Sequence, residues 1–199
     1  MKITILGCGS ATGTPAVGLG WGDLDPNNIK NQRLRSSILV EKGETCILID
    51  TTPDLRQQLL NAGVNRLDAV LYTHFHADHL NGIDDLRQIN RVMNSSIKMY
   101  ADQRTMDEIK ERFGYVIEPL AVGASFYYKP TLDPHILDDN SNLKIGDIEI
   151  DIFSQDHGFS NTLGFRFGPI AYSTDVVELS EKAFEVLSGV DTWIIGVLN

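Results

Sequence analysis

The sequence predicts an α/β fold in which one β-sheet packs on another and helices cover the outside. Short β-rich runs carry apolar residues on both faces, which indicates strands that are buried on both sides. Amphipathic stretches of helical period alternate with these runs along the chain. At 199 residues the chain can build one sizeable core, so we expect residues 1–199 to form a single domain.

The expected strands are short runs rich in β-branched and aromatic residues. They lie at 2–6, 36–41, 45–50, 68–72, 97–101, 126–129, 147–153, 163–167, 170–173 and 190–195. The strands 163–167 and 170–173 should form a hairpin, because Gly168 and Pro169 stand between them as a turn signal.

The clearest expected helix begins with Thr52 as its N-cap and Pro53 at its first helical position, and it ends at Gly63. Its apolar residues recur at helical spacing. Further helices are expected at 82–92, at 102–113 and at 179–187.

A metal-binding loop is predicted directly after the strand 68–72. It reads Thr-His-Phe-His-Ala-Asp-His over residues 73–79. In an extended segment His74 and His76 point the same way and can hold one ion, whereas Asp78 and His79 reach toward a second. A single histidine usually lies in a polar loop without a metal, but three histidines and a carboxylate at this spacing are far more specific. Imidazole and carboxylate ligands favour Zn, Mn, Fe or Ni over Ca or Mg.

This loop resembles the metal loop of the metallo-β-lactamase superfamily of hydrolases. The resemblance implies a four-layer αββα sandwich, and it implies that a further His and a bridging Asp arrive from later strands. His157 follows the run 147–153 and matches that histidine. Asp175 follows the strand 170–173 and matches the bridging carboxylate, although a helix N-cap is the alternative reading of this residue. His135 matches no ligand, and we expect it on the surface.

Other segments resemble the branch of the superfamily that includes the phosphonate-pathway phosphodiesterase, which opens cyclic ribose phosphates. The resemblance rests on the glycine-rich segment 7–15 and on segments 33–37, 48–54 and 82–87. Within these segments Ser10, Thr12 and Arg35 are candidate substrate contacts.

The expected activity is metal-dependent hydrolysis, of the phosphodiesterase type, by a metal-activated water. His74, His76 and His157 would hold one Zn or Mn ion, and a second ion would be held by Asp78, His79 and Asp175. Asp78 would also orient the attacking water. Two alternatives stay open: hydrolysis of a thioester, lactone or related carbonyl substrate, and a catalytically impaired metal-binding remnant.

The last metal histidine of the superfamily lies well beyond the strand 190–195, whereas this sequence stops at Asn199. We therefore expect a C-terminally shortened domain whose second metal site is incomplete. The apolar run from Trp193 to Leu198 should then be exposed and should favour a homo-oligomer.

The formal net charge of −10 weighs against an extended nucleic-acid partner, because such binding neutralises phosphates with Lys and Arg. A small phosphorylated substrate remains compatible with this charge, since bound cations would offset the acidic ligands. We find neither a signal-peptide pattern nor a spanning segment, so a cytoplasmic protein without a membrane partner is expected.

Overall fold

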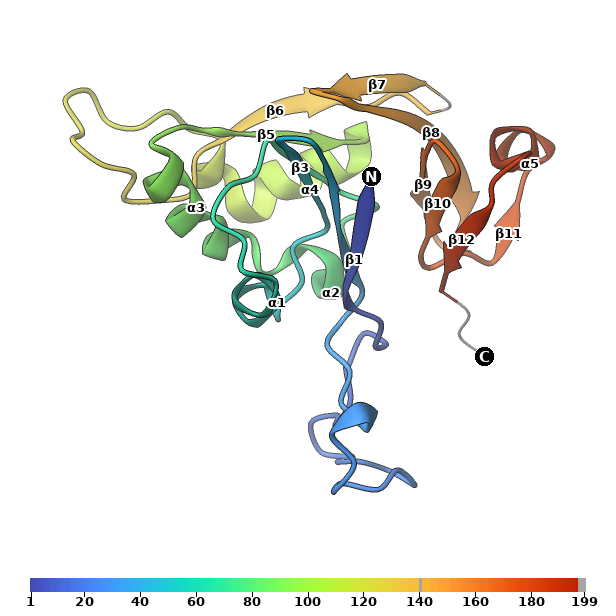
Figure 1. Ribbon diagram of the computed structural model, residues 1–199. Coiled ribbons are helices and arrows are strands. Elements are labelled where there is room, and N and C mark those ends of the chain that lie inside the picture. Colours follow the sequence, from blue (N-terminus) through green and yellow to red (C-terminus); the bar gives the residue numbers. More distant parts are fainter. Residues whose placement is uncertain (140, 197–199) are drawn as a thin grey trace.

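The computed structural model describes residues 1–139 and 141–196 and contains two six-stranded sheets that pack face to face (Figure 1). Helices cover the outer face of the first sheet, and one helix lies beside the second. The α/β sandwich predicted from the sequence is therefore confirmed.

The first sheet has the strand order β1-β2-β3-β4-β5-β6. The strands β1, β2 and β3 are antiparallel neighbours, and β3 to β6 run parallel to one another. Their bounds are β1 (Lys2–Gly7), β2 (Ser37–Lys42), β3 (Thr45–Ile49), β4 (Ala69–Leu71), β5 (Ile97–Ala101) and β6 (Leu132–Ile136). Because parallel strands end at a common edge, the loops that follow β3, β4 and β5 meet there.

The second sheet has the order β11-β8-β9-β10-β12, and β7 also pairs with β8. Only β10 and β12 are parallel among the pairs of this sheet that the structure describes. The bounds are β7 (Asn142–Ile145), β8 (Ile148–Asp156), β9 (Asn161–Phe167), β10 (Ile170–Ser173), β11 (Glu178–Leu179) and β12 (Thr192–Ile195).

Side chains along the strands of the first sheet point alternately to its two faces, and they form two separate cores. Ile38 and Val40 of β2 face the second sheet, where they pack among residues of β8 and β9. Leu39, between them, faces the helices. Successive side chains of a strand point to opposite faces, so a strand that is apolar at every position is buried on both sides.

Five α-helices and three short 3₁₀ helices are described in residues 1–139 and 141–196. They are η1 (Ile29–Asn31), α1 (Leu55–Ala62), α2 (Ala77–Leu80), η2 (Ile83–Asp85), α3 (Leu86–Met93), α4 (Gln103–Phe113), η3 (Gly114–Val116) and α5 (Glu181–Leu187). Helices α1, α3 and α4 bury their apolar stripes against the first sheet (Figure 1). Among them no helix is both long and apolar enough to cross a membrane.

Several predicted boundaries were wrong. Residues 126–129 form no strand, and the edge strand β6 begins instead at Leu132. Pro134 lies within β6, which an edge strand tolerates because one side of it needs no hydrogen bond. The first predicted helix starts two residues later than Pro53, because the hydroxyl of Thr52 accepts a hydrogen bond from the Asp54 backbone in a turn before α1. Strands β7 and β11 were not predicted.

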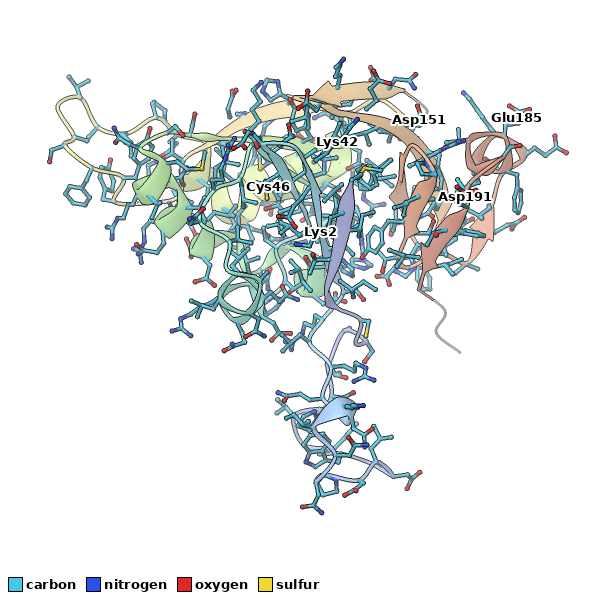
Figure 2. The ribbon with its side chains drawn as sticks, viewed as in Figure 1. Lys2, Lys42, Cys46, Asp151, Glu185 and Asp191 are labelled. Carbon is cyan, nitrogen blue, oxygen red and sulfur yellow. The ribbon has the colours of Figure 1, made fainter. Side chains whose placement is uncertain are left out.

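The segment between β1 and β2 extends away from the sandwich (Figures 1 and 2). At its base Thr14 and Arg33 exchange two backbone hydrogen bonds. The two flanking strands are joined at their far end by an ion pair of 2.7 Å between Lys2 and Glu41. At the other end of the chain, residues 197 and 198 of the predicted exposed run lie outside the described residues, while Trp193 and Ile195 are 37% and 38% exposed.

A first prediction concerns Gly82, which follows α2 and lies close to the turn before α1. A Cβ at Gly82 would lie 1.9 Å from the backbone oxygen of Thr52. Gly82→Ala should therefore lower the free energy of unfolding by about 1–3 kcal/mol, as overpacking does. Chemical denaturation measures this change.

The matched control is Gly114→Ala, because Gly114 has right-handed helical geometry and a Cβ there meets nothing within 4 Å. This variant should be neutral or more stable by up to about 1 kcal/mol. Equal effects of the two substitutions would contradict the packing argument.

Candidate metal centre

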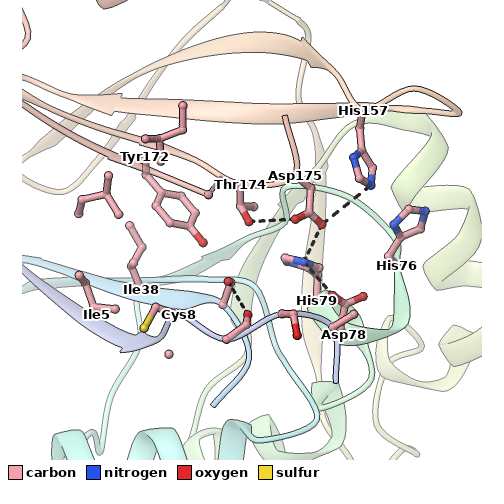
Figure 3. A pocket seen from close by; sticks show the side chains of 18 residues that line it. Ile5, Cys8, Ile38, His76, Asp78, His79, His157, Tyr172, Thr174 and Asp175 are labelled. Carbon is pink, nitrogen blue, oxygen red and sulfur yellow. Dashed lines mark hydrogen bonds and ion pairs between the residues drawn. The ribbon is translucent and has the colours of Figure 1, made fainter. Parts of the chain in front are cut away.

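Three loops from the two sheets bring polar side chains to one edge of the sandwich. The loop after β4 carries His74 and His76 and leads into the one-turn helix α2, which carries Asp78 and His79. His157 comes from the loop after β8 and Asp175 from the loop after β10. Figure 3 shows the side chains of His76, Asp78, His79, His157 and Asp175, which point toward one another.

His74, His76, His157 and Asp175 form a first group of potential ligands. One ligand atom from each lies within 4.8 Å of the others. The Asp175 Oδ2 atom is 3.3 Å from His74 Nε2 and 4.0 Å from His157 Nε2. The ring centroids of His74 and His76 are 4.5 Å apart.

Asp78, His79 and Asp175 form a second group that meets the same criterion. His79 Nε2 is 3.1 Å from Asp175 Oδ2 and 3.3 Å from Asp78 Oδ2. Asp175 thus belongs to both groups, and the structure brings together all six residues that the sequence analysis named as candidate ligands.

The residues of these groups fit divalent metal ions. His74 is fully buried, and its Nε2 atom has no hydrogen-bond partner among the described residues. A buried nitrogen without a partner is costly unless a ligand completes it. Imidazole nitrogens and carboxylate oxygens are the ligand types of catalytic Zn sites and of related transition metals.

Asp50 organises both groups without belonging to either, and sequence reasoning missed this role. Its carboxylate is fully buried and accepts hydrogen bonds from the backbone and the hydroxyl of Thr73, both at 2.8 Å. His79 Nδ1 lies 2.7 Å from Asp50 Oδ2. Since the Thr73 hydroxyl donates to Asp50, it accepts from His74 Nδ1 at 3.0 Å. Both His74 and His79 are therefore held with Nε2 free to bind a metal.

The signal for Asp50 was a carboxylate directly after the apolar strand β3. Its backbone has the left-handed value φ = 65°, and Asp175 has φ = 52°. Left-handed backbone is uncommon outside glycine, although Asp adopts it more readily than most residues. No helix begins at Asp175, so its alternative reading as an N-cap is wrong.

Protonation of the ligands follows from these contacts. Burial opposes charge on His79, but the carboxylates of Asp50, Asp175 and Asp78 outweigh it and hold the His79 pKa well above its usual value. Burial likewise opposes charge on Asp175, yet the imidazoles of His74 and His79, with Nε2 atoms 3.3 and 3.1 Å from its Oδ2 atom, keep its pKa far below the usual value. Burial, together with His74 and His157, lowers the pKa of His76.

A cavity of about 470 Å³ opens beside the second group (Figure 3). Its wall includes Asp78, His79, Asp175 and the segment from Gly7 to Ala11. Of the three candidate substrate contacts, Ser10 lines this cavity, whereas Thr12 and Arg35 are not among its lining residues. Arg35 instead binds Asp54 at 2.9 Å and the Ala11 carbonyl at 2.8 Å, so it ties the segment after β1 to the start of α1.

His135 lies on β6, away from both groups. It stacks on Tyr100 and forms an ion-pair contact of 2.9 Å with Asp133. Its side chain is 40% exposed, in agreement with the surface position expected from the sequence.

Comparison with known proteins relates this geometry to one family. Residues 45–199 match the family model described as "Beta-lactamase superfamily domain". The fold is similar to the crystal structure of a new diphosphatase from the PhnP family, with 30% sequence identity and a TM-score of 0.83, over 96% of this chain and 71% of that one.

Two curated relatives are longer proteins. An octanoyltransferase of Porphyromonas gingivalis is 33% identical over 94% of this chain, and a ribonuclease Z of Bradyrhizobium sp. (strain ORS 278) is 27% identical over 69%. The chain spans 37% of the octanoyltransferase and 45% of the ribonuclease Z.

The role of Asp50 makes a prediction for metal affinity. Asp50→Asn should weaken binding of the second ion by about 10–100-fold, because the amide cannot replace the carboxylate as the partner of both Thr73 and His79. Titration of the metal-free protein with Zn²⁺ measures this change.

The control for that titration is Asp68→Asn, because Asp68 accepts hydrogen bonds from Cys46 and Arg66 away from the centre. Its metal affinity should equal that of the unsubstituted protein. Unchanged affinity in Asp50→Asn would contradict the assigned role.

The opposite pKa shifts of His76 and His79 make a prediction for pH. His79 retains its proton until the pH exceeds its raised pKa, so the second ion must displace that proton. His76 has a lowered pKa and is neutral at lower pH. Between about pH 6 and about pH 8, affinity for the second ion should therefore rise more steeply than affinity for the first. Metal content after dialysis at each pH tests this, and equal slopes would contradict it.

Proposed function

The chain belongs to the β-lactamase superfamily, and from the geometry of its metal centre we propose that it is a metal-dependent hydrolase of phosphodiesters in a small phosphorylated substrate. The observation that carries the proposal is the shared carboxylate of Asp175, which has an oxygen within reach of both ligand groups.

A shared carboxylate suits the cleavage of a phosphodiester. Divalent ions held by the two groups would acidify the attacking water and stabilise the charge that develops on the attacking and leaving oxygens. The protein has to hold the two groups of ligands at a fixed separation. Asp175 does so because it is only 16% exposed and contacts His74 and His79 at 3.3 and 3.1 Å.

The other residues have distinct roles in this proposal. His74, His76 and His157 would hold the first ion, and Asp78 and His79 the second. The Asp78 side chain is 19% exposed and borders the cavity, so it can also accept a proton or orient a water there. Ser10 lies across the cavity as a hydroxyl that can contact the substrate.

An anionic substrate is supported by two arginines beside the metal loop, on a chain with a net charge of −10. The guanidinium carbons of Arg104 and Arg112 lie 4.7 and 5.7 Å from the ring centroid of Phe75, which in turn is 5.1 Å from the ring of His76. Arg112 pairs with Glu108, but Arg104 has no ion pair with any residue in 1–139 and 141–196. Such a cation attracts a charged ligand toward the centre.

The comparisons support phosphorus chemistry more than acyl chemistry. The similar solved structure is named a diphosphatase, and one relative is named ribonuclease Z. The relative named octanoyltransferase favours an acyl substrate as the second candidate, but this chain spans only 37% of that protein. Both candidates would use the same metal centre.

The proposal predicts the behaviour of two histidine variants. His76→Ala should lose first-site metal and lower hydrolysis of bis-p-nitrophenyl phosphate by at least about 100-fold, because a removed ligand disrupts the centre. The apolar cores do not include His76, so the variant should still fold. His135→Ala, the matched control, should retain metal and activity. Metal analysis and initial rates measure both effects.

The same assay separates the candidate functions. Turnover of the phosphodiester but not of p-nitrophenyl octanoate supports the proposal, and the reverse result supports the acyl candidate. Metal binding at both groups without turnover of either substrate would instead identify a metal-binding protein without hydrolase activity.

A further inference from the structure

Tyr172 of β10 carries a hydroxyl group that the protein leaves without a partner. The residue is 4% exposed, and its Oη atom makes no hydrogen bond with any of the described residues. Leaving a buried hydroxyl unpaired destabilises the folded protein, because the group loses its hydrogen bonds to water and gains none. A phenylalanine would fill the same space without that cost, so the hydroxyl requires an explanation.

Tyr172 belongs to the wall of the cavity beside the metal centre. Tyr172 lies three residues before Asp175, and both line the cavity. In Figure 3 the tyrosine oxygen points toward the space that Thr174 and Asp175 border. A ligand in this cavity would therefore have the metal ligands on one side and Tyr172 on another.

The other hydroxyl groups of the described cavity wall already have partners. Ser36 donates to the Gly9 carbonyl at 3.1 Å, and Thr174 donates to Asp175 at 3.3 Å. Ser10 lies 3.2 Å from the Thr12 hydroxyl. Among these groups the hydroxyl of Tyr172 alone is left with a hydrogen to donate.

The surroundings keep that hydrogen in place. Burial and the negative charges of Asp50 and Asp175 outweigh the opposing effect of the nearby Thr174 side chain and hold the pKa of Tyr172 well above its usual value. The group therefore acts as a hydrogen-bond donor at any ordinary pH, and its best acceptor is an oxygen that carries negative charge.

We propose that the Tyr172 hydroxyl donates a hydrogen bond to a phosphoryl oxygen of the substrate bound at the metal centre. The inference rests on the proposed function and adds a specific substrate-binding residue to it. The substrate supplies the partner that the protein lacks, so the cost of the unpaired hydroxyl is recovered when the substrate binds.

The test compares Tyr172→Phe with the unsubstituted protein, both loaded with Zn²⁺. Inorganic phosphate is the probe, and thermal unfolding is recorded with and without it. Without phosphate the variant should bind the same amount of metal and unfold at the same or a higher temperature. The affinity of the variant for phosphate should be lower by at least about tenfold, because a hydrogen bond to a charged group is lost.

Two control variants match the two measurements. Tyr72→Phe also removes a buried hydroxyl, but one that is paired with Thr51 at 3.0 Å, so this variant should unfold at a lower temperature. Tyr115→Phe removes a hydroxyl that binds Asp84 outside the cavity wall, and its phosphate affinity should be unchanged.

The outcomes separate this inference from the proposed function. Equal phosphate affinity in Tyr172→Phe and the unsubstituted protein would overturn the inference and leave the function standing. A lower unfolding temperature with unchanged phosphate affinity would show that the hydroxyl has a structural partner, such as a buried water, and would overturn it as well. If phosphate stabilises neither protein, the proposed function fails and the inference fails with it.

Discussion

The metal centre depends on one buried carboxylate. Asp50 is inaccessible to solvent, and a buried charge is tolerated only where hydrogen bonds and opposite charge surround it. It meets this condition by accepting from Thr73 and from His79, so the cost of burying it is offset only when the loop after β4 and helix α2 are in place. The position of the loop and the orientation of its imidazoles are therefore coupled through a single group.

The sandwich explains why distant segments of the chain meet at this carboxylate. Strands β3, β4 and β5 are parallel, so the segments that follow them emerge at the same edge of the first sheet. The apolar layer between the sheets holds the second sheet at a fixed distance, and the loops after β8 and β10 then place His157 and Asp175 opposite the metal loop. Most of this arrangement comes from apolar packing, which is independent of the metal.

The sequence predicted what depends on local pattern and missed what depends on tertiary contact. The candidate ligands of the loop 73–79 were predictable because their spacing is short and specific, and His157 and Asp175 because each follows a recognisable strand. Asp50 was not, since its role requires contacts with Thr73 and His79 that are more than 20 residues away. The strand predicted at 126–129 failed because an aromatic-rich segment can equally lie exposed in a loop, as Phe126 does at 55%.

Buried polar atoms without hydrogen-bond partners lower the stability of the fold, and most of them lie in one region. Five buried side-chain atoms lack partners among the described residues, and four belong to segments that border the centre. These are His74 Nε2, Tyr172 Oη and atoms of Gln155 and Ser160, which flank His157. Other buried polar groups, such as the Ser37 hydroxyl, are paired, and the fifth unpaired atom is the hydroxyl oxygen of Thr105 on α4. Most of the unpaired groups lie around one cavity, so ligands bound there would supply their missing partners. An imidazole nitrogen needs a ligand that accepts an electron pair, and a hydroxyl group needs a ligand that accepts a hydrogen bond. Divalent metal ions and the anionic oxygens of a substrate together have these properties.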